Sequence, residues 1–121
     1  MARVEVEDSW IVAGDRAEVR RAVERFFQQR KMQIITQADR EFVAKQGSQL
    51  LTRLLGGWFV PATWLPKRAT VRLRQVEGGT RVSAVIEETM GFGFIDPLFE
   101  KKYRNFFEAW VDELHEAVQP G

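Results

Sequence analysis

The amino-acid sequence predicts an α+β fold: an antiparallel sheet of about six strands, in the order β-α-β-β-β-β-β-α, with a long C-terminal helix packed across it. Three observations predict this fold. Apolar side chains alternate along several short segments, two other segments have helical apolar spacing, and glycine-rich turns separate neighbouring strands. The chain of 121 residues favours one domain, which we expect at residues 1–119, with a tail at residues 120–121.

The N-terminal part of the chain predicts a strand, a helix and two further strands. Apolar residues of one parity indicate a strand over residues 3–12, interrupted at Asp8. Asp15 is suited to cap a helix, because Glu18 follows at capping-box spacing, and apolar residues then recur on one face to about Arg30. That face would consist of Val19, Ala22, Val23, Phe26 and Phe27, and the two following strands would occupy residues 32–37 and 40–46.

The clearest hairpin joins residues 68–76 to residues 81–90 through a Gly-Gly turn. If the two glycines form the loop, Leu73 pairs with Ala84, and the apolar parity of both strands faces the core. The opposite face would then carry mainly charged or polar side chains: Arg72, Arg74, Arg81, Ser83, Val85 and Glu87. We expect a solvated surface there, and the alternative is a site for phosphate or for an acidic partner.

Two further elements complete the predicted order. Residues 49–55 favour a returning strand, although their leucines also fit one face of a helical turn. The final helix has a clear start, because Asp96 is suited to cap it and Pro97 to occupy its first position. A wide apolar stripe follows over about 20 residues, or roughly 30 Å of helix. It consists of Phe99, Tyr103, Phe106, Phe107, Trp110, Val111, Leu114 and Val118.

The order of elements resembles the helix-grip architecture of the START-related superfamily, which contains lipid-transfer domains, pollen-allergen-like proteins and polyketide cyclases. The matching pieces are the capped helix from Asp15, the VEGGTRV hairpin and the GFGFIDP passage into the last helix. The resemblance implies an apolar ligand between the sheet and the last helix, with Phe92 and Phe94 beside the entrance. Two alternatives stay open. One is a TATA-binding-protein-like half domain, and the other is a helix-grip domain in which its own aromatic side chains fill the space between the sheet and the last helix.

An unusually apolar stretch lies between Leu50 and Leu65, much of it interrupted by proline. Loops are usually polar, so the stretch either folds back over the open end of the sheet, lines a ligand cavity, or docks on a membrane or partner. The basic neighbours Arg53, Lys67 and Arg68 suit docking on an anionic membrane surface. We therefore predict ligand-binding residues in this stretch, between the end of the last strand and the final helix, and on the final helix itself. They are Trp58, Phe59, Trp64, Glu88, Phe92, Phe94, Tyr103 and Phe107.

Few residues are suited to catalysis or metal binding. The chain has no cysteine and a single histidine, His115, so we expect no metal and no cofactor. Glu88 has buried-face parity near a strand end, and with Tyr103 it is the residue that an enzyme would use as acid or base. The net charge is +1, so we expect no nucleic-acid partner. The N-terminus lacks the apolar segment of a signal peptide, which favours a cytoplasmic protein.

These observations lead to three functional hypotheses. The first is a non-catalytic domain that binds an apolar or amphipathic, lipid-like small molecule between the sheet and the C-terminal helix. The second is an interaction module with a solid core, whose residues 50–65 dock on a membrane surface, a partner or a second copy in a homodimer. The third is a small cyclase-like enzyme.

Overall fold

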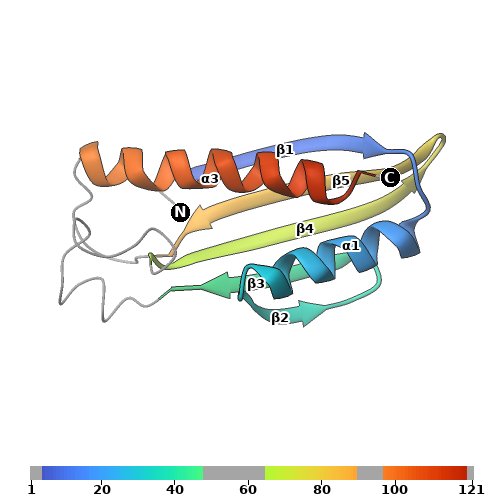
Figure 1. The fold of residues 1–121 in the computed structure, drawn as a ribbon, viewed down its shortest axis with the longest axis horizontal. Helices are drawn as coiled ribbons and strands as arrows, with labels where there is room; N and C mark the ends of the chain where they lie inside the picture. Colours follow the sequence, from blue (N-terminus) through green and yellow to red (C-terminus); the bar gives the residue numbers. More distant parts are fainter. Residues whose placement is uncertain (1–3, 48–64, 90–96, 120–121) are drawn as a thin grey trace.

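A five-stranded antiparallel sheet carries two helices on one of its faces (Figure 1). The structure, a computed structural model, describes residues 4–47, 65–89 and 97–119. The strand order is β1-β5-β4-β3-β2, so the N-terminal strand pairs with the last strand of the chain. In chain order the elements are β1 (Glu5–Val12), α1 (Arg16–Gln29), β2 (Gln33–Gln37), β3 (Glu41–Gln46), β4 (Lys67–Val76), β5 (Gly79–Glu88) and α3 (Pro97–Ala117).

The predicted α+β class is confirmed, with five strands in the sheet rather than about six. The five strands lie close to the bounds that their alternating side chains predict. The additional strand predicted at residues 49–55 lies outside the described residues. The described sheet therefore consists of the segments with the clearest alternation.

The register of the β4–β5 hairpin differs from the predicted one by two residues. Leu73 pairs with Val82 rather than with Ala84, because Glu77 and Gly78 form the loop instead of the two glycines. The buried parity is unchanged, since side chains alternate across a strand with a period of two. The same apolar side chains therefore face the core, and the arginines of the opposite parity are exposed.

Helix α1 has the predicted cap and the predicted buried face. The Asp15 carboxylate accepts a hydrogen bond from the backbone N–H of Glu18 at 2.8 Å, which satisfies one free donor of the first turn. The helix ends at Gln29, and Lys31 follows with a φ of 58°. The buried face packs toward β4 and α3 and consists of Val19, Val23, Phe26 and Phe27.

The core lies between the sheet and the two helices. Helix α3 packs against β1 and β5, while α1 packs against β4. Aromatic rings join these layers, because Trp110 of α3 and Phe42 of β3 each lie 6.1 Å from Phe27 of α1, measured between ring centroids. In the described part of the predicted apolar stripe, Phe106 is partly buried, and the residues that are buried are Tyr103, Phe107, Trp110, Val111, Leu114 and Val118, the last just after α3.

The other face of the sheet carries no helix within the described residues (Figure 1). Its two edges are β1 and β2. Strand β1 presents the exposed acidic residues Glu5, Glu7 and Asp8. The short β2 contains a bulge around Ile35, whose side chain is 45% exposed. Both edges thus differ from a flat, regular, apolar strand.

Candidate functional site

A row of polar side chains crosses three strands at one end of the helix-covered face. Gln46 of β3 pairs with Lys67 of β4, and Lys67 pairs with Glu88 of β5. Directly paired residues point to the same face of a sheet, so these three side chains, the polar row, lie side by side. Lys67 is 1% exposed and Glu88 is 5% exposed, although ionisable side chains are seldom buried so deeply.

Lys67 has the most unusual surroundings in the polar row. Its Nζ donates a hydrogen bond to Gln46 Oε1 at 3.5 Å and lies 4.6 Å from the centroid of the Phe106 ring on α3. Gln46 in turn donates through Nε2 to the carbonyl of Arg30 at 2.8 Å, which ties the row to the end of α1. Burial lowers the pKa of Lys67 from 10.5 to about 7, because the ammonium loses its hydration. This side chain can therefore exchange a proton near neutral pH.

Helix α3 places two aromatic side chains beside the polar row. The hydroxyl of Tyr103 donates to the carbonyl of Pro66, the residue before Lys67, at 2.9 Å. The same carbonyl accepts a hydrogen bond from the backbone N–H of Thr89 at 3.1 Å. Tyr103 and Phe107 are one helical turn apart and fully buried, with ring centroids separated by 5.4 Å. The site thus combines a polar floor on the sheet with an aromatic wall on the helix.

Trp110 adds an unpaired polar atom to the same helix face. Tyr103, Phe107 and Trp110 have the spacing i, i+4 and i+7, which brings them onto one side of α3. The Trp110 side chain is buried, and its Nε1–H has no acceptor in the described part of the chain. An unpaired buried donor costs about 1–3 kcal/mol. An oxygen of a bound molecule at this position would offset that cost.

The structure brings together the predicted site residues that it describes. Glu88, Tyr103 and Phe107 lie at the same end of the helix–sheet interface, and all three are buried. Their role in binding stays a prediction, as does docking through residues 50–65. The remaining predicted site residues lie outside the described residues: Trp58, Phe59, Trp64, Phe92 and Phe94.

Lys67 and Gln46 are not among the ligand-binding residues predicted from the sequence. The position of Lys67 beside an apolar stretch suggests an exposed basic flank, but this residue is the first of β4 and points toward the core. The signal that could have located it is parity, because Lys67 alternates in step with the buried residues Ala69, Val71 and Leu73. Strand parity therefore outweighs the local composition at this position.

Replacing Tyr103 by phenylalanine is expected to lower the free energy of unfolding by about 1 kcal/mol. The loss is small because the Pro66 carbonyl keeps its hydrogen bond from Thr89. Tyr103→Ala should lower it by about 3–5 kcal/mol, since a fully buried ring is removed. Urea denaturation followed by tryptophan fluorescence measures both changes. Equal losses in the two variants would show that the hydroxyl, and not the packing of the ring, dominates at this position.

Other features of the described residues lie away from the polar row. Hollows of about 560 Å³ and 520 Å³ lie near the start of α1, and one of about 280 Å³ is lined by residues of β1 and β5. Within this part of the chain, no three carboxylate or histidine side chains form a group that could hold a metal ion. None of the helices described there is both long and apolar enough to cross a membrane.

The sheet order and the long C-terminal helix over one face define a helix-grip fold. No protein-family model and no curated protein sequence matches the chain. Similar solved structures exist, and their agreement extends over nearly the whole chain. The predicted helix-grip resemblance is therefore confirmed at the level of the fold.

Three solved structures illustrate this similarity. The di-domain ARO/CYC protein StfQ of the steffimycin biosynthetic pathway matches with a TM-score of 0.63 and 13% identity; the match covers 96% of this chain and 50% of StfQ. Protein MLL2253 from Mesorhizobium loti matches with a TM-score of 0.61 and 9% identity, covering 94% of this chain and 96% of that protein. The Aha1 dimer from Colwellia psychrerythraea matches with a TM-score of 0.57 and 10% identity, covering 98% of this chain and 98% of that chain. Identities this low establish a shared fold alone.

Proposed function

We propose that the domain binds an amphipathic small molecule between the sheet and α3. Its polar end would lie at the polar row and its apolar part against the aromatic face of α3. The observation that carries this proposal is the burial of Lys67 and Glu88 side by side in an otherwise apolar interior. A protein with well-packed apolar side chains in place of both is often at least as stable, because each buried ion loses several kcal/mol of hydration. A binding function accounts for the presence of such groups.

Lys67 makes an acidic or carbonyl-bearing head group the best fit. Below its lowered pKa the side chain is an ammonium that attracts a carboxylate, and above it the neutral amine donates to a carbonyl oxygen. The Glu88 carboxylate beside it would accept a hydrogen bond from a hydroxyl of the same head group. The Nε1–H of Trp110 supplies a further donor along α3. These groups together favour a ligand with several oxygens at one end.

The aromatic face of α3 supplies the apolar half of the proposed site. Tyr103 and Phe107 present buried rings next to the polar row. Apolar contact contributes about 25 cal/mol per Å² removed from water, reduced by the free energy lost on association. StfQ, an ARO/CYC protein of a biosynthetic pathway, has the same fold, which supports a small-molecule role. The ligand expected from this chemistry is a long-chain or polycyclic acid or ketone.

Titration with cis-parinaric acid, a fluorescent long-chain carboxylic acid, tests the proposal. Wild-type protein is expected to give a saturable increase in fluorescence. Lys67→Met should weaken binding by about tenfold, because the carboxylate loses its cationic partner. Methyl parinarate, which has no negative charge but keeps a carbonyl oxygen, should lose less affinity in Lys67→Met than the acid does. The matched control is Lys45→Met, since Lys45 lies on β3 with its side chain exposed.

Native mass spectrometry of the purified protein provides the second measurement. A compound that co-purifies and is displaced by parinarate would support binding at the proposed place. Two results would overturn the proposal. One is an unloaded mass together with no saturable binding of either acid or ester, and the other is the same affinity loss in Lys67→Met and Lys45→Met.

A small cyclase-like enzyme is the second candidate function. It is favoured by the pairing of Lys67, whose pKa is about 7, with Glu88 on the next strand. Sequence reasoning alone does not locate such a pair, which general acid–base chemistry requires. Recovery of the bound compound after incubation separates the two candidates. A compound changed by wild type but returned unchanged by Lys67→Met would support catalysis, and a compound unchanged by both would support binding alone.

A further inference from the structure

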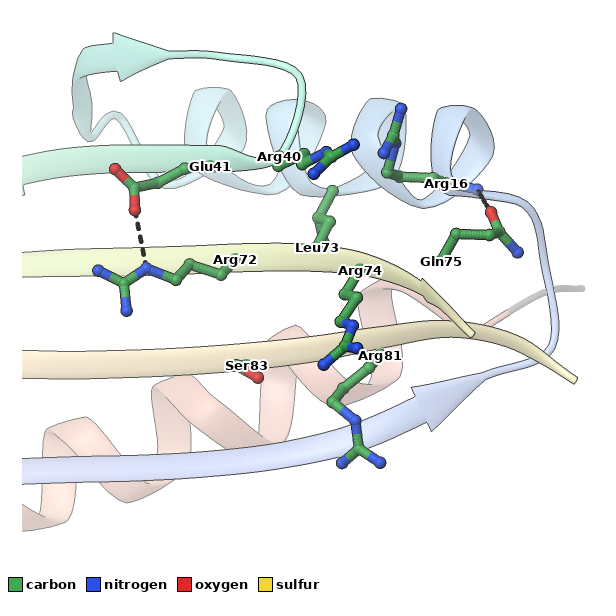
Figure 2. Close-up of a pocket in the computed structure, with 9 residues that line it drawn as sticks. All are labelled: Arg16, Arg40, Glu41, Arg72, Leu73, Arg74, Gln75, Arg81 and Ser83. Atoms are coloured by element: carbon green, nitrogen blue, oxygen red, sulfur yellow. Dashed lines mark hydrogen bonds and ion pairs between the residues drawn. The ribbon is translucent and has the colours of Figure 1, made fainter. Parts of the chain in front are cut away.

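The sheet carries a second unusual cluster of charge at the end opposite the polar row. A hollow of about 560 Å³ lies beside the tip of the β4–β5 hairpin and the start of α1 (Figure 2). Five arginines line it, together with a single acidic residue, Glu41. The arginines come from α1, the turn before β3, and strands β4 and β5: Arg16, Arg40, Arg72, Arg74 and Arg81.

The hollow arises because β4 extends beyond β3. Pairing between these strands begins at Glu41, which lies opposite Arg72, so the last residues of β4 project past the end of β3. The start of α1 approaches from the other side, where the backbone N–H of Arg16 donates to Gln75 Oε1 at 3.1 Å. Figure 2 shows Arg16 and Arg40 beside α1, with Arg74 extending from β4 toward β5. Backbone pairing thus fixes the places from which these side chains project.

Two of the arginines stand directly opposite each other. Arg74 pairs with Arg81 across the β4–β5 ladder, and like charges in directly opposed positions destabilise a sheet. Their Cβ atoms are about 5 Å apart in such a pair. The fold does not require this arrangement, because both side chains are exposed and neither packs in the core. A bound anion between them would turn the repulsion into attraction.

The partners of the other arginines leave most of the positive charge unbalanced. Arg72 pairs with Glu41 at 2.8 Å, and Arg81 donates to Ser9 Oγ at 3.4 Å. Within the described residues, the guanidinium groups of Arg16, Arg40 and Arg74 make no ion pair. The hollow therefore presents several forked donors to solvent on one side of the molecule.

We propose that this arginine hollow binds a small multivalent oxyanion, of the diphosphate or polycarboxylate type. The planar guanidinium forms paired hydrogen bonds with phosphate or carboxylate oxygens, and several of them together select a ligand with more than one negative charge. A small anion fits this volume, whereas the described residues that line the hollow include none of the aromatic side chains on which nucleic-acid bases stack. The site is independent of the one proposed under α3.

Isothermal titration with pyrophosphate, citrate and sodium chloride at matched ionic strength tests the proposal. Wild-type protein is expected to bind pyrophosphate or citrate saturably and to show no saturable heat with chloride. Stronger binding of pyrophosphate would identify a phosphate ligand, and stronger binding of citrate would identify a polycarboxylate. Arg74→Gln/Arg81→Gln is expected to weaken binding by about tenfold or more.

The matched control is Arg21→Gln/Arg25→Gln, which removes the same charge from exposed positions of α1 outside the hollow. Its affinity for the anion should stay close to that of wild type. Equal weakening in the two double variants would show that net charge, and not the hollow, attracts the anion. That result, or the absence of saturable binding by wild type, would overturn the proposal.

A thermal melt without added anion gives an independent readout. Because Arg74 and Arg81 repel each other in the free protein, Arg74→Gln should raise the melting midpoint by about 2 °C. Pyrophosphate should raise the midpoint of wild type more than that of Arg74→Gln. A lower midpoint for Arg74→Gln in the absence of anion would show that the fold itself uses this charge, which contradicts the proposal.

Discussion

Between about pH 6 and pH 10, the free energy of unfolding of wild type is expected to rise by roughly 2–4 kcal/mol relative to that of Lys67→Met. Burial lowers the pKa of Lys67 from 10.5 to about 7, so the folded protein in acid must keep an ammonium out of water. Between these two pKa values the unfolded chain binds more protons than the folded protein, and the stability of wild type therefore rises with pH. Wild type should accordingly gain stability relative to Lys67→Met from pH 7 toward pH 10.5.

Urea denaturation at about pH 6, 8 and 10, followed by tryptophan fluorescence, measures this dependence. Lys45→Met is the control, because the exposed Lys45 should leave the pH profile of wild type unchanged. All other titrating groups are common to the three proteins and cancel in the differences. Parallel profiles for wild type and Lys67→Met would contradict the assignment of Lys67 as a desolvated amine. The denaturation experiment requires no ligand.

Gly79→Ala is expected to lower the free energy of unfolding by about 3 kcal/mol or more. Gly79 has a φ of 149°, which L side chains rarely adopt. A Cβ at this position would also collide with the carbonyl of Val12, whose carbon atom would lie only 2.9 Å away. The obstacle is backbone of β1 and cannot rotate away, so the β1–β5 pairing at Val12 and Thr80 would have to shift.

The neighbouring Gly78 provides the matched control. It has a φ of 89°, yet nothing lies within 4 Å of a Cβ placed on it. Gly78→Ala should therefore cost about 1–2 kcal/mol, the amount due to backbone strain alone. Chemical denaturation of both variants separates strain from collision. If Gly78→Ala is as destabilising as Gly79→Ala, the close approach of β1 to the hairpin is not what requires glycine.

Local patterns are sufficient to predict most elements of this fold. The cap at Asp15, the spacing of apolar residues in α1 and α3, and the alternation in the strands each depend on residues near one another in sequence. The register of the β4–β5 hairpin, in contrast, is subject to contacts between residues far apart in sequence. At Gly79 the backbone of Val12, from a distant part of the chain, leaves no room for a Cβ, and Glu77 and Gly78 form the loop. The pairing of β1 with β5 likewise depends on tertiary contacts.

The candidate site is predictable only in part. Glu88, Tyr103 and Phe107 follow from parity and helical spacing, whereas Lys67 contradicts the usual exposure of lysine. Its burial becomes evident once β3, β4 and β5 are aligned, since the alignment puts Gln46 and Glu88 on either side of it. The residue type says only how often lysines are buried in general. The register of the sheet determines whether a particular lysine is buried.

The two edge strands have a consequence for self-association. If two copies met through their β1 edges, Glu5, Glu7 and Asp8 of each would approach the same carboxylates of the other, and like charges would repel. At the opposite edge, the bulge around Ile35 interrupts the straight ladder that an incoming strand would need. Fibrillar growth by strand addition is therefore disfavoured at both sides.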